Sequence, residues 1–536
     1  MVDQNIIDNI VKELAELNFA DDLDFSTTLR KIFNKYKIAP LPKATLISSY
    51  RQLLKDGVLV EDKKLTRLLI KRAIRTLSGV SVITVLSKPF ACPGKCIYCP
   101  SEPDMPKSYL SNEPAAMRAK LNLFDPIRQM TMRIKALENN GHQVDKLEVL
   151  VLGGTWSAYP DDYQQEFIRD LFYAANTMEQ KKERKKLSLI EEQKINEDTK
   201  YKIIGLTLET RPDFINEAEI KRMRNLACTR VQLGVQHTDN KILDLIQRGH
   251  TIEQSIKATR LLKEVGIKID HHYMPDLPGS TPAKDLEMFK YVFNSPDLQP
   301  DQIKIYPCIV NEFAELNKWL EEGKYKPYSK TELLNLLLEV KKITPPYVRI
   351  NRLIRDIPEE SILAGNKITN LRQKLQQELK EAGGSCKCIR CREVRNEEVD
   401  INQIELVTRE YKASQGTEWF LSFENDDQTK IYGFLRLRIN DEVAKNIFPE
   451  LENASLVREL HVYGKMIPVT DSKDKDKTIF KTQHLGLGKR LMAEAEKLTL
   501  KQGLNKIAVI SGIGVRNYYK KLGYKSEGTY VTKTLK

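Results

Sequence analysis

The sequence predicts an α/β protein in which an open barrel of six βα units follows a helical segment and precedes a second, smaller α/β domain. The chain has 536 residues, which is too long for a single hydrophobic core. Six short apolar runs between residues 81 and 307 alternate with helical patterns, as in parallel βα units. After about residue 400 a further series of strand-like runs begins, so we expect a separate domain there.

The first segment, residues 1–75, is predicted to be helical and to carry a basic face. Basic residues recur every four positions at Lys63, Arg67, Lys71 and Arg75, with Arg72 beside them. Like charges at this spacing repel one another, and a nucleic-acid phosphate backbone would relieve the repulsion. The spacing therefore favours a nucleic-acid contact, and a solvated basic face is the alternative.

Residues 76–370 contain the six predicted barrel strands, each a β-rich apolar run bounded by polar residues, glycine or proline. The runs are SVITVL (81–86), LEVLVLGG (147–154), YKIIGLTLET (201–210), RVQLGVQ (230–236), IKIDHHYMP (267–275) and QIKIYP (302–307). Six units are too few to close a TIM barrel. We therefore expect a partial, TIM-like (βα)6 barrel whose chemistry lies at the carboxyl ends of its strands.

The last two predicted parts are a cysteine-rich linker, residues 371–398, and the second α/β domain, residues 399–536. Strand-like runs in this domain are EWFLSFEN, YGFLRLRI, SLVRELHVYG, NKIAVISG and YKSEGTYVTKTL. Two helices are predicted among them, at about 486–503 and 514–521.

Composition limits the class of protein. No run of about eighteen apolar residues occurs, and the acidic N-terminus lacks the basic start of a signal peptide, so we expect a cytoplasmic protein without a membrane span. The net charge of +13 fits a nucleic-acid partner, although many basic proteins bind none. Six of the eight cysteines form two tight clusters, which in a reducing compartment indicates metal binding. Cys228 and Cys308 stand alone and are expected to be ordinary buried thiols.

The first cysteine cluster, ACPGKCIYCP, directly follows the first predicted strand. Cys92, Cys96 and Cys99 can hold three irons of a 4Fe–4S cluster and leave the fourth iron open to a substrate. A zinc site would more often use paired Cys-x2-Cys units and four protein ligands. The spacing resembles the radical S-adenosylmethionine (SAM) superfamily, in which the open iron binds SAM. Tyr98 matches the aromatic residue usual there.

Residues at the ends of the next three strands are candidates for SAM binding. Gly153 and Gly154 end the second strand, Glu209 and Arg211 the third, and Gln236 the fourth. A glycine pair lets the backbone approach the methionine amino group, and a carboxylate and a guanidinium can pair with the ribose hydroxyls and the SAM carboxylate. Each residue alone also has a plain structural explanation, so the prediction depends on their joint position at the strand ends.

The second cysteine cluster lies in the linker, within GGSCKCIRCREV. Cys386, Cys388 and Cys391 place three sulfurs close together after two glycines, which suits zinc. Three free thiols are the alternative, and the pattern does not name a fourth ligand. Zinc at this place would join the two domains as a structural staple.

The stretch QHLGLGKRLM begins the long helix of the last domain. Gln483, Gly486 and Gly488 would let backbone N–H groups face an anion at the N-terminus of this helix. The strand RELHVYG precedes it, NKIAVISG follows, and NYYKKLGY lies one helix later. This order resembles the GCN5-related acetyltransferase (GNAT) domains, whose loop holds the pyrophosphate of acetyl-CoA.

The resemblance to GNAT domains implies a set of acetyl-CoA-binding residues. They are Glu459, Leu460, His461 and Val462 of the preceding strand, Gln483, Gly486, Leu487, Gly488 and Lys489 of the loop, and Tyr518 and Tyr519 near the thioester sulfur. One of the two tyrosines is expected to pack in the core. Glu459 and His461 would either line the acetyl site or form a pair of polar groups.

The two modules together resemble the family of the Elongator catalytic subunit, which carboxymethylates the wobble uridine of tRNA. The resemblance runs from about residue 70 to the C-terminus, through stretches such as VDKLEVLVLGGTW, LTLETRPD, MPDLPGS and RNYYKKLGY. Ser101 and Glu102 stand where the family usually has Gly-Gly, and no cluster ligand is lost. Lys146 matches a family lysine that contacts acetyl-CoA between the domains.

The resemblance implies that an adenosyl radical takes hydrogen from the methyl group of acetyl-CoA. The carbon radical then adds to carbon 5 of the wobble uridine, and thioester hydrolysis leaves 5-carboxymethyluridine. The base would be turned out of the anticodon stem-loop, with phosphates held by residues such as Lys71, Arg72 and Arg75. The electron donor stays unidentified, and the chain would act either without accessory subunits or as a homodimer. The alternative hypothesis is a protein lysine acetyltransferase with a structural iron–sulfur cluster.

Overall fold

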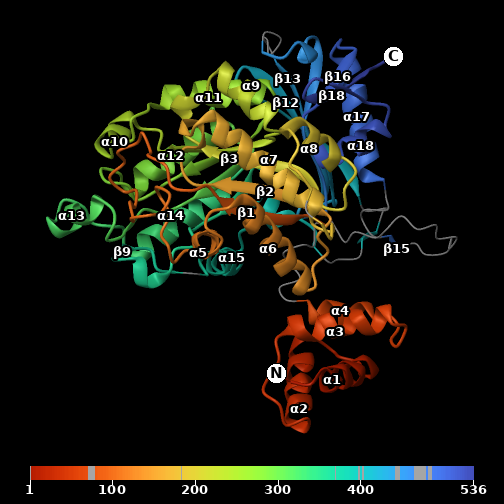
Figure 1. The fold of residues 1–536 in the computed structure, drawn as a ribbon. Coiled ribbons are helices and arrows are strands. Elements are labelled where there is room, and N and C mark those ends of the chain that lie inside the picture. Colours follow the sequence, from red (N-terminus) through yellow and green to blue (C-terminus); the bar gives the residue numbers. More distant parts are fainter. Residues whose placement is uncertain are drawn as a thin grey trace.

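The computed structural model shows a lobe of N-terminal helices, a parallel barrel and a C-terminal mixed sheet (Figure 1). It describes all residues except 1, 71–78, 183, 369, 396–398, 401–403, 441–446, 464–478 and 481–485. Four residues with a predicted binding role therefore lie outside the described part, namely Lys71, Arg72, Arg75 and Gln483. Within the described part, no helix has both the length and the apolar character needed to cross a membrane.

Four helices at the N-terminus form a lobe with its own hydrophobic core. They are α1 (Gln4–Glu16), α2 (Asp22–Lys35), α3 (Lys43–Lys55) and α4 (Lys63–Leu69). An aspartate caps each of α1, α2 and α4 by accepting hydrogen bonds from backbone N–H groups of the first turn. Arg51 joins the lobe to the barrel, because its guanidinium donates to the carbonyls of Glu138 and Gly141.

Seven parallel strands form the barrel sheet in the order β1-β2-β3-β4-β5-β6-β8. Their bounds are β1 (Ser81–Leu86), β2 (Lys146–Leu152), β3 (Lys202–Thr210), β4 (Arg230–Gln236), β5 (Lys268–Tyr273), β6 (Gln302–Ile305) and β8 (Arg349–Arg352). The six predicted strands are all present. The seventh, β8, was not predicted, because RINR is short and half of it is charged. Since β1 and β8 lie at opposite ends of the order, the predicted open barrel is confirmed.

Helices connect the strands of the barrel sheet, and several of them pack on its outer face (Figure 1). They are α5 (Pro114–Leu121), α6 (Pro126–Asn139), α7 (Asp161–Thr177), α8 (Leu189–Asn196), α9 (Glu217–Asn225), α10 (Asn240–Leu245), α11 (Ile252–Glu264), α12 (Pro282–Asn294), α13 (Leu316–Glu321), α14 (Lys330–Ile343), α15 (Leu371–Glu381) and α16 (Ile389–Arg392). Two short strands, β7 (Ile309–Val310) and β9 (Ala364–Gly365), form a separate antiparallel pair; β7 follows β6 in the chain and β9 precedes α15. Each long helix buries one apolar face, as α12 does with Met288, Phe289 and Val292.

The C-terminal domain is a mixed sheet in the order β11-β12-β13-β14-β16-β18-β17. Its elements are β11 (Glu405–Lys412), β12 (Gly416–Glu424), β13 (Ile431–Asn440), β14 (Ala454–Val462), α17 (Leu487–Lys501), β16 (Lys506–Val509), α18 (Arg516–Lys520), β17 (Lys525–Glu527) and β18 (Tyr530–Thr534). Two further short strands, β10 (Val399–Asp400) and β15 (Ile479–Phe480), pair with each other outside this sheet. The strands β14 and β16 run parallel and pair only over Ala454–Val457. Beyond Val457, β14 continues without this neighbour.

The C-terminal sheet packs against the end of the barrel where the strands begin. Leu456, Ala508 and Tyr530 belong to the same hydrophobic cluster as barrel residues such as Ile203. A network of ion pairs lies beside this cluster and joins the two parts. All its members are buried, and they are Lys263, Asp301, Glu418, Arg436, Arg438 and Arg458.

Asp301 and Glu418 are the two anions of this network. Arg458 of β14 donates to both carboxylate oxygens of Asp301, which precedes β6, at 2.6 and 2.8 Å. Arg458 and Lys263 of α11 each donate to Glu418 of β12 at 2.9 Å. Burial raises the pKa of Glu418, but Arg458 and Lys263 lower it to about 2. This folded pKa lies below the ordinary value, so the stabilisation is complete at neutral pH and disappears as the pH falls from about 4 towards 2.

We expect removal of the Glu418 charge to destabilise the protein. Glu418→Gln leaves three buried cations short of compensation, and such a change costs about 3–5 kcal/mol of unfolding free energy. Urea denaturation measures this loss. Glu315→Gln, at an exposed pair with Lys318, is the control and should leave the urea midpoint unchanged. Equal midpoints for the two variants would contradict a joining role for the network.

Candidate active site

The cysteine loop follows β1 at the barrel edge where the carboxyl ends of the strands meet. Its backbone is held from two sides. The N–H of Ile97 donates to the carbonyl of Ile246 at 3.2 Å, and the N–H of Leu316 donates to the carbonyl of Ile97 at 2.8 Å. A loop anchored in this way holds its side chains in place before a ligand binds.

Cys92, Cys96 and Cys99 line one cavity. An added Cβ at Gly94 would lie 3.6 Å from the sulfurs of both Cys92 and Cys96, so these two sulfurs face the same space. Arg248 donates to the Cys96 sulfur at 3.4 Å. Burial raises the pKa of Cys96, but the Arg248 cation outweighs it, and the pKa lies below the usual value of a thiol. This favours the thiolate, which is the form that binds a metal.

The residues predicted to bind SAM gather around the cysteine loop. Glu209 of β3 accepts a hydrogen bond from the Tyr109 hydroxyl at 2.7 Å. Arg211 donates twice to Asp213, at 2.9 Å each, while its Nη1 has no partner among the described residues. A buried guanidinium nitrogen without a partner, beside the cysteines, is available to a carboxylate ligand.

Of the two glycines after β2, Gly154 brings backbone to the same cavity, and Gly153 precedes it. Gly153 and Gly154 have φ of 141° and 101°, a region that favours glycine. An added Cβ at Gly153 would collide with the Ser87 hydroxyl. Gly154, Tyr98 and Gln236 line the cavity together with Glu209 and Arg211, so the structure brings the predicted strand-end residues to one place.

The cavity has a volume of about 1190 Å³ and passes through the barrel. Glu148, Leu150 and Leu152 line it at successive depths, because alternate residues of β2 face the same side. Its far end includes Arg349, the first residue of β8, which donates to the Tyr463 hydroxyl of the C-terminal domain at 3.0 Å. The cavity thus extends from the cysteine loop to the part of the barrel that meets the C-terminal sheet.

The predicted residues of β14 lie near this far end, close to Glu148, although none of them lines the cavity. The carboxylate of Glu459 accepts from Lys268 at 2.8 Å and from Arg436 at 3.1 Å, so it bridges the two parts as a paired polar group. The His461 ring contacts the Tyr463 ring with centroids 4.3 Å apart. Burial lowers the pKa of His461 to about 4, so its imidazole is neutral at neutral pH.

The start of α17 lies beside the end of β14. Gly486 caps the helix with φ of 64°, and none of the side chains that the structure describes caps its first N–H groups. An added Cβ at Gly488 would lie 2.9 Å from the Tyr518 hydroxyl and 3.7 Å from the side chain of Val462. Gly488, Val462 and Tyr518 therefore lie next to one another, and, among the described residues, open space surrounds Gly486 at the start of the helix.

The remaining predicted residues of this domain have different surroundings. Tyr519 is buried in the domain core with Leu487, and Leu460 packs against that core, whereas Tyr518 is 37% exposed. Lys489 is exposed on the first turn of α17. Lys146 begins β2 at the barrel end that faces the C-terminal domain.

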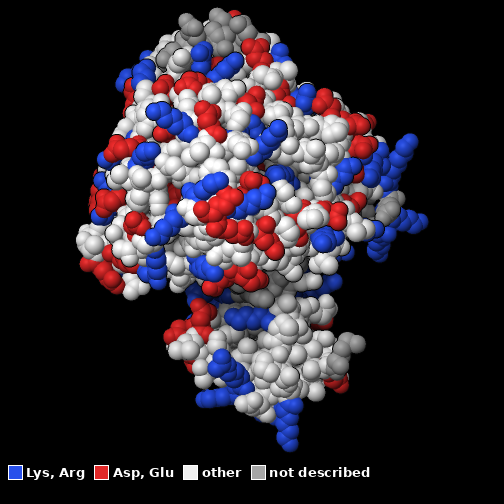
Figure 2. All heavy atoms as spheres, turned by 90° about the vertical axis from the view of Figure 1, so that its left-hand side faces the viewer, with Lys and Arg blue, Asp and Glu red and all other residues white. Residues whose placement is uncertain are grey.

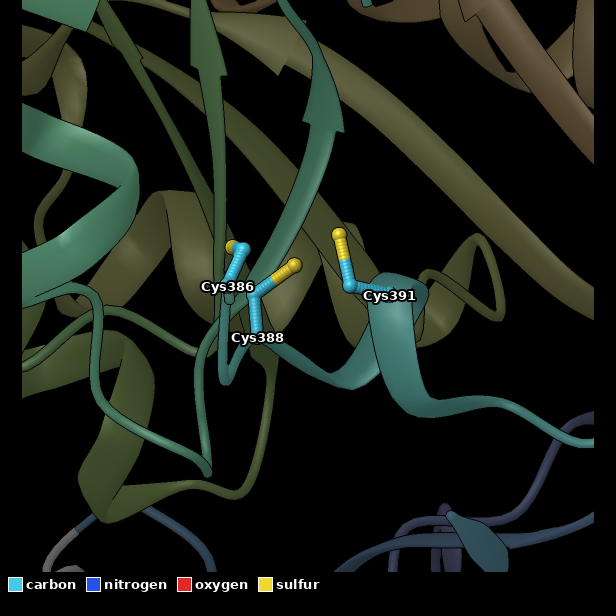
Figure 3. Close-up of side chains that lie close together, drawn as sticks. All are labelled: Cys386, Cys388 and Cys391. Carbon is cyan, nitrogen blue, oxygen red and sulfur yellow. The ribbon is translucent and has the colours of Figure 1, made fainter. Parts of the chain in front are cut away.

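The second cysteine cluster (Figure 3) lies in the chain between the barrel and the C-terminal domain, and the neighbouring Arg392 donates to both Pro346 and Glu424. The sulfurs of Cys386, Cys388 and Cys391 lie within 4.8 Å of one another, which suits a single metal ion. Hydrogen bonds from Cys386 and Cys388 lower the pKa of Cys391 well below its usual value, and Lys341 donates to the same sulfur at 3.7 Å. No other trio of His, Cys, Asp or Glu in the described ranges meets this spacing, and a wider spacing is expected where cysteines bind separate irons.

The basic face predicted for the N-terminal segment is described only in part. Lys63 and Arg67 lie one turn apart on α4 and are both exposed. On the face shown in Figure 2, basic and acidic side chains are interspersed over the main body. The net positive charge is therefore not gathered into one patch on that face.

Arg248 and the polar residues inside the barrel were not predicted from the sequence. Arg248 holds both the Cys96 sulfur and, at 2.6 Å, the carbonyl of Gly234. Gln232, Asp270 and Lys304 line the cavity. Polar residues that alternate with apolar ones inside a barrel strand would have been the signal, because they must face the interior.

Comparisons with known proteins agree with the fold and the cysteine loop. Residues 87–292 match the model of the radical SAM superfamily, and residues 300–381 match that of the radical SAM C-terminal domain. A tRNA uridine(34) acetyltransferase of Methanocaldococcus infernus is 41% identical over 99% of this chain and 98% of its own length. Elongator complex protein 3 of Homo sapiens is 37% identical over 99% of this chain and 97% of its own length.

A solved structure, the archaeal Methanocaldococcus infernus Elp3 with an N-terminal deletion, has a TM-score of 0.73 and 40% identity. It covers 85% of this chain and all of its own. The full-length relatives also align with the N-terminal helices, so the similarity begins well before residue 70, where the motifs alone had placed it.

We expect the loop cysteines to be required for iron binding. After anaerobic reconstitution with iron and sulfide, Cys92→Ala, Cys96→Ala and Cys99→Ala should each lose most of the iron and the iron–sulfur absorption of the wild type. Cys228→Ser is the matched control, because Cys228 is buried far from the loop and donates to the Arg230 carbonyl, which serine can also do. Wild-type iron content in all three alanine variants would contradict the assignment.

Proposed function

The chain belongs to the radical SAM family that includes the tRNA uridine(34) acetyltransferases and Elongator complex protein 3, and we propose that it uses acetyl-CoA to form 5-carboxymethyluridine at the wobble uridine of tRNA. The observation that carries this proposal is the cavity that runs from the cysteine loop to Arg349, whose guanidinium contacts Tyr463 next to the end of β14. A single cavity lets two cofactor sites act on one base. The names of the relatives support uridine 34 as the target.

The residues at the cysteine loop fit a 4Fe–4S cluster and SAM, which membership of the superfamily implies. Cys92, Cys96 and Cys99 would hold the cluster, and the free Nη1 of Arg211 would bind the SAM carboxylate. When bound, the cluster and SAM supply radical chemistry that activates a C–H bond. Gly153 and Gly154 offer close backbone approach, and Tyr109 orients Glu209 for the ribose.

The C-terminal domain is proposed to bind acetyl-CoA as GNAT domains do. The first N–H groups of α17, which no described side chain caps, suit a pyrophosphate, because a helix N-terminus attracts anions. The edge of β14 beyond Val457 leaves backbone groups for the amides of the pantetheine arm. Tyr518, rather than the buried Tyr519, is then the tyrosine beside the ligand.

Two further segments, the linker and the N-terminal lobe, are proposed to bind zinc and tRNA, respectively. Residues 371–398 would form a zinc-binding linker, in which Cys386, Cys388 and Cys391 supply three ligands. The N-terminal lobe, with Lys63 and Arg67 exposed on α4, would contact phosphates of the anticodon stem-loop.

The reaction can be tested with the full-length protein after reconstitution of its iron. Incubation with tRNA, acetyl-CoA, SAM and a reductant should give 5-carboxymethyluridine at position 34, detected by mass spectrometry of digested nucleosides. Cys96→Ala should give none, and Glu315→Gln should match the wild type. Formation of 5′-deoxyadenosine without tRNA modification would refute the proposal. Acetylation of lysine side chains in its place would favour a protein acetyltransferase.

We expect purified protein to carry zinc that depends on the linker cysteines. Cys388→Ser should lose the zinc and lower the temperature of unfolding, because a structural zinc site contributes to folding stability. Its reconstituted iron content should stay at the wild-type level. Elemental analysis measures both metals, and a wild-type protein without zinc would rule the site out.

A further inference from the structure

On β4 and β5, inside the barrel, three buried side chains have a polar atom without a partner among the described residues. They are Gln232 of β4 with Nε2, Asp270 of β5 with Oδ1 and His272 of β5 with Nε2. All three line the cavity and are at most 7% exposed. Buried polar groups are normally hydrogen-bonded, so three free atoms at one cavity indicate a polar ligand.

For Gln232 and Asp270, neighbouring side chains determine which polar atom stays without a partner. Lys304 donates to Oε1 of Gln232 at 2.6 Å, and since lysine can only donate, the amide Nε2 is the free end. Asn351 donates to Oδ2 of Asp270 at 2.9 Å and leaves Oδ1 free. Gln232 and Asp270 are register partners on adjacent strands, so a donor and an acceptor lie side by side.

His272 adds a second donor next to Asp270. It lies two residues further along β5 and therefore on the same side of the strand. Burial and the nearby Lys304 lower the pKa of His272 well below its usual value, so the imidazole is neutral. With the proton on Nε2 of His272, the site presents a donor (Gln232 Nε2), an acceptor (Asp270 Oδ1) and a second donor (His272 Nε2).

We propose that Gln232, Asp270 and His272 bind the Watson–Crick edge of uracil and select uridine over cytidine. This inference rests on the proposed function and adds the residues that choose the base. Uracil offers the acceptor O4, the donor N3–H and the acceptor O2, which complement the three free atoms. Binding through this edge leaves carbon 5 unobstructed.

Asp270 is the residue that excludes cytosine. Cytosine has a lone pair at N3 where uracil has a hydrogen, so its N3 would face Asp270 Oδ1 as acceptor against acceptor. A buried acceptor that loses its donor, and instead meets a second acceptor, disfavours the complex.

Replacing Asp270 by asparagine should change the base that is preferred. In Asp270→Asn the Asn351 amide still holds the side-chain oxygen, so the new amide nitrogen faces the cavity and can donate to N3 of cytosine. Binding of an anticodon stem-loop RNA with uridine at position 34 should weaken roughly ten- to a hundredfold, and binding of the same RNA with cytidine should strengthen. Fluorescence anisotropy with the full-length, iron-loaded protein measures both. Asp270→Ala is the matched control. It should bind the uridine RNA more weakly than the wild type does, without binding the cytidine RNA more tightly.

Further measurements separate a folding defect from a change in base preference. Iron content and unfolding temperature check that the variants are folded. If the Asp270 variants do not fold, Gln232→Leu should weaken binding of the uridine RNA and keep the exclusion of cytidine.

An unchanged uridine-to-cytidine ratio of binding affinities in Asp270→Asn, with a wild type that still modifies uridine 34, would overturn this inference and leave the proposed function intact. A changed KM for acetyl-CoA with unchanged base preference would overturn it too, and would assign the three residues to acetyl-CoA. A wild type that leaves uridine 34 unmodified would instead contradict the proposed function.

Discussion

Two buried carboxylates, Asp301 and Glu418, determine where the barrel and the C-terminal sheet meet. Each is surrounded by cations from both parts. Buried charges are tolerated only when every partner is in place, so this network permits one relative position of the two sheets. Arg458 reaches it through a bulge in β14, since Glu459 pairs with Arg436 and Val457 with Leu437, leaving Arg458 between them.

The position held by these charges makes the proposed chemistry possible. It brings the end of β14 to the barrel, where Lys268 binds Glu459 and Arg349 binds Tyr463 at the far end of the cavity. The cavity itself is lined by residues between Val82 and Arg390, and the C-terminal domain contacts its far end through Tyr463. The barrel contributes the cysteine loop and the polar interior, and the C-terminal domain contributes the start of α17, so the proposed active site exists only in the joined protein.

Local patterns were predicted well from the sequence. The six barrel strands and the cysteine loop follow from apolar runs and from the spacing of Cys92, Cys96 and Cys99. The roles of adjacent tyrosines did not follow, because Tyr518 and Tyr519 sit on one short helix and only packing separates the exposed ring from the buried one. The ion network was not predicted either, since Asp301 and Arg458 are 157 residues apart and neither belongs to a motif. Contacts of this kind depend on how the two sheets dock, which short-range patterns do not contain.

The central claim, that one cavity serves both cofactor sites, can be tested by blocking the cavity. Leu150 lies between Glu148 and Leu152 on the cavity side of β2, so Leu150→Trp would place an indole across the passage. We predict that this variant binds iron and acetyl-CoA as the wild type does but forms no 5-carboxymethyluridine in tRNA. Formation of the modified nucleoside at the wild-type rate by a folded, iron-loaded Leu150→Trp protein would contradict it.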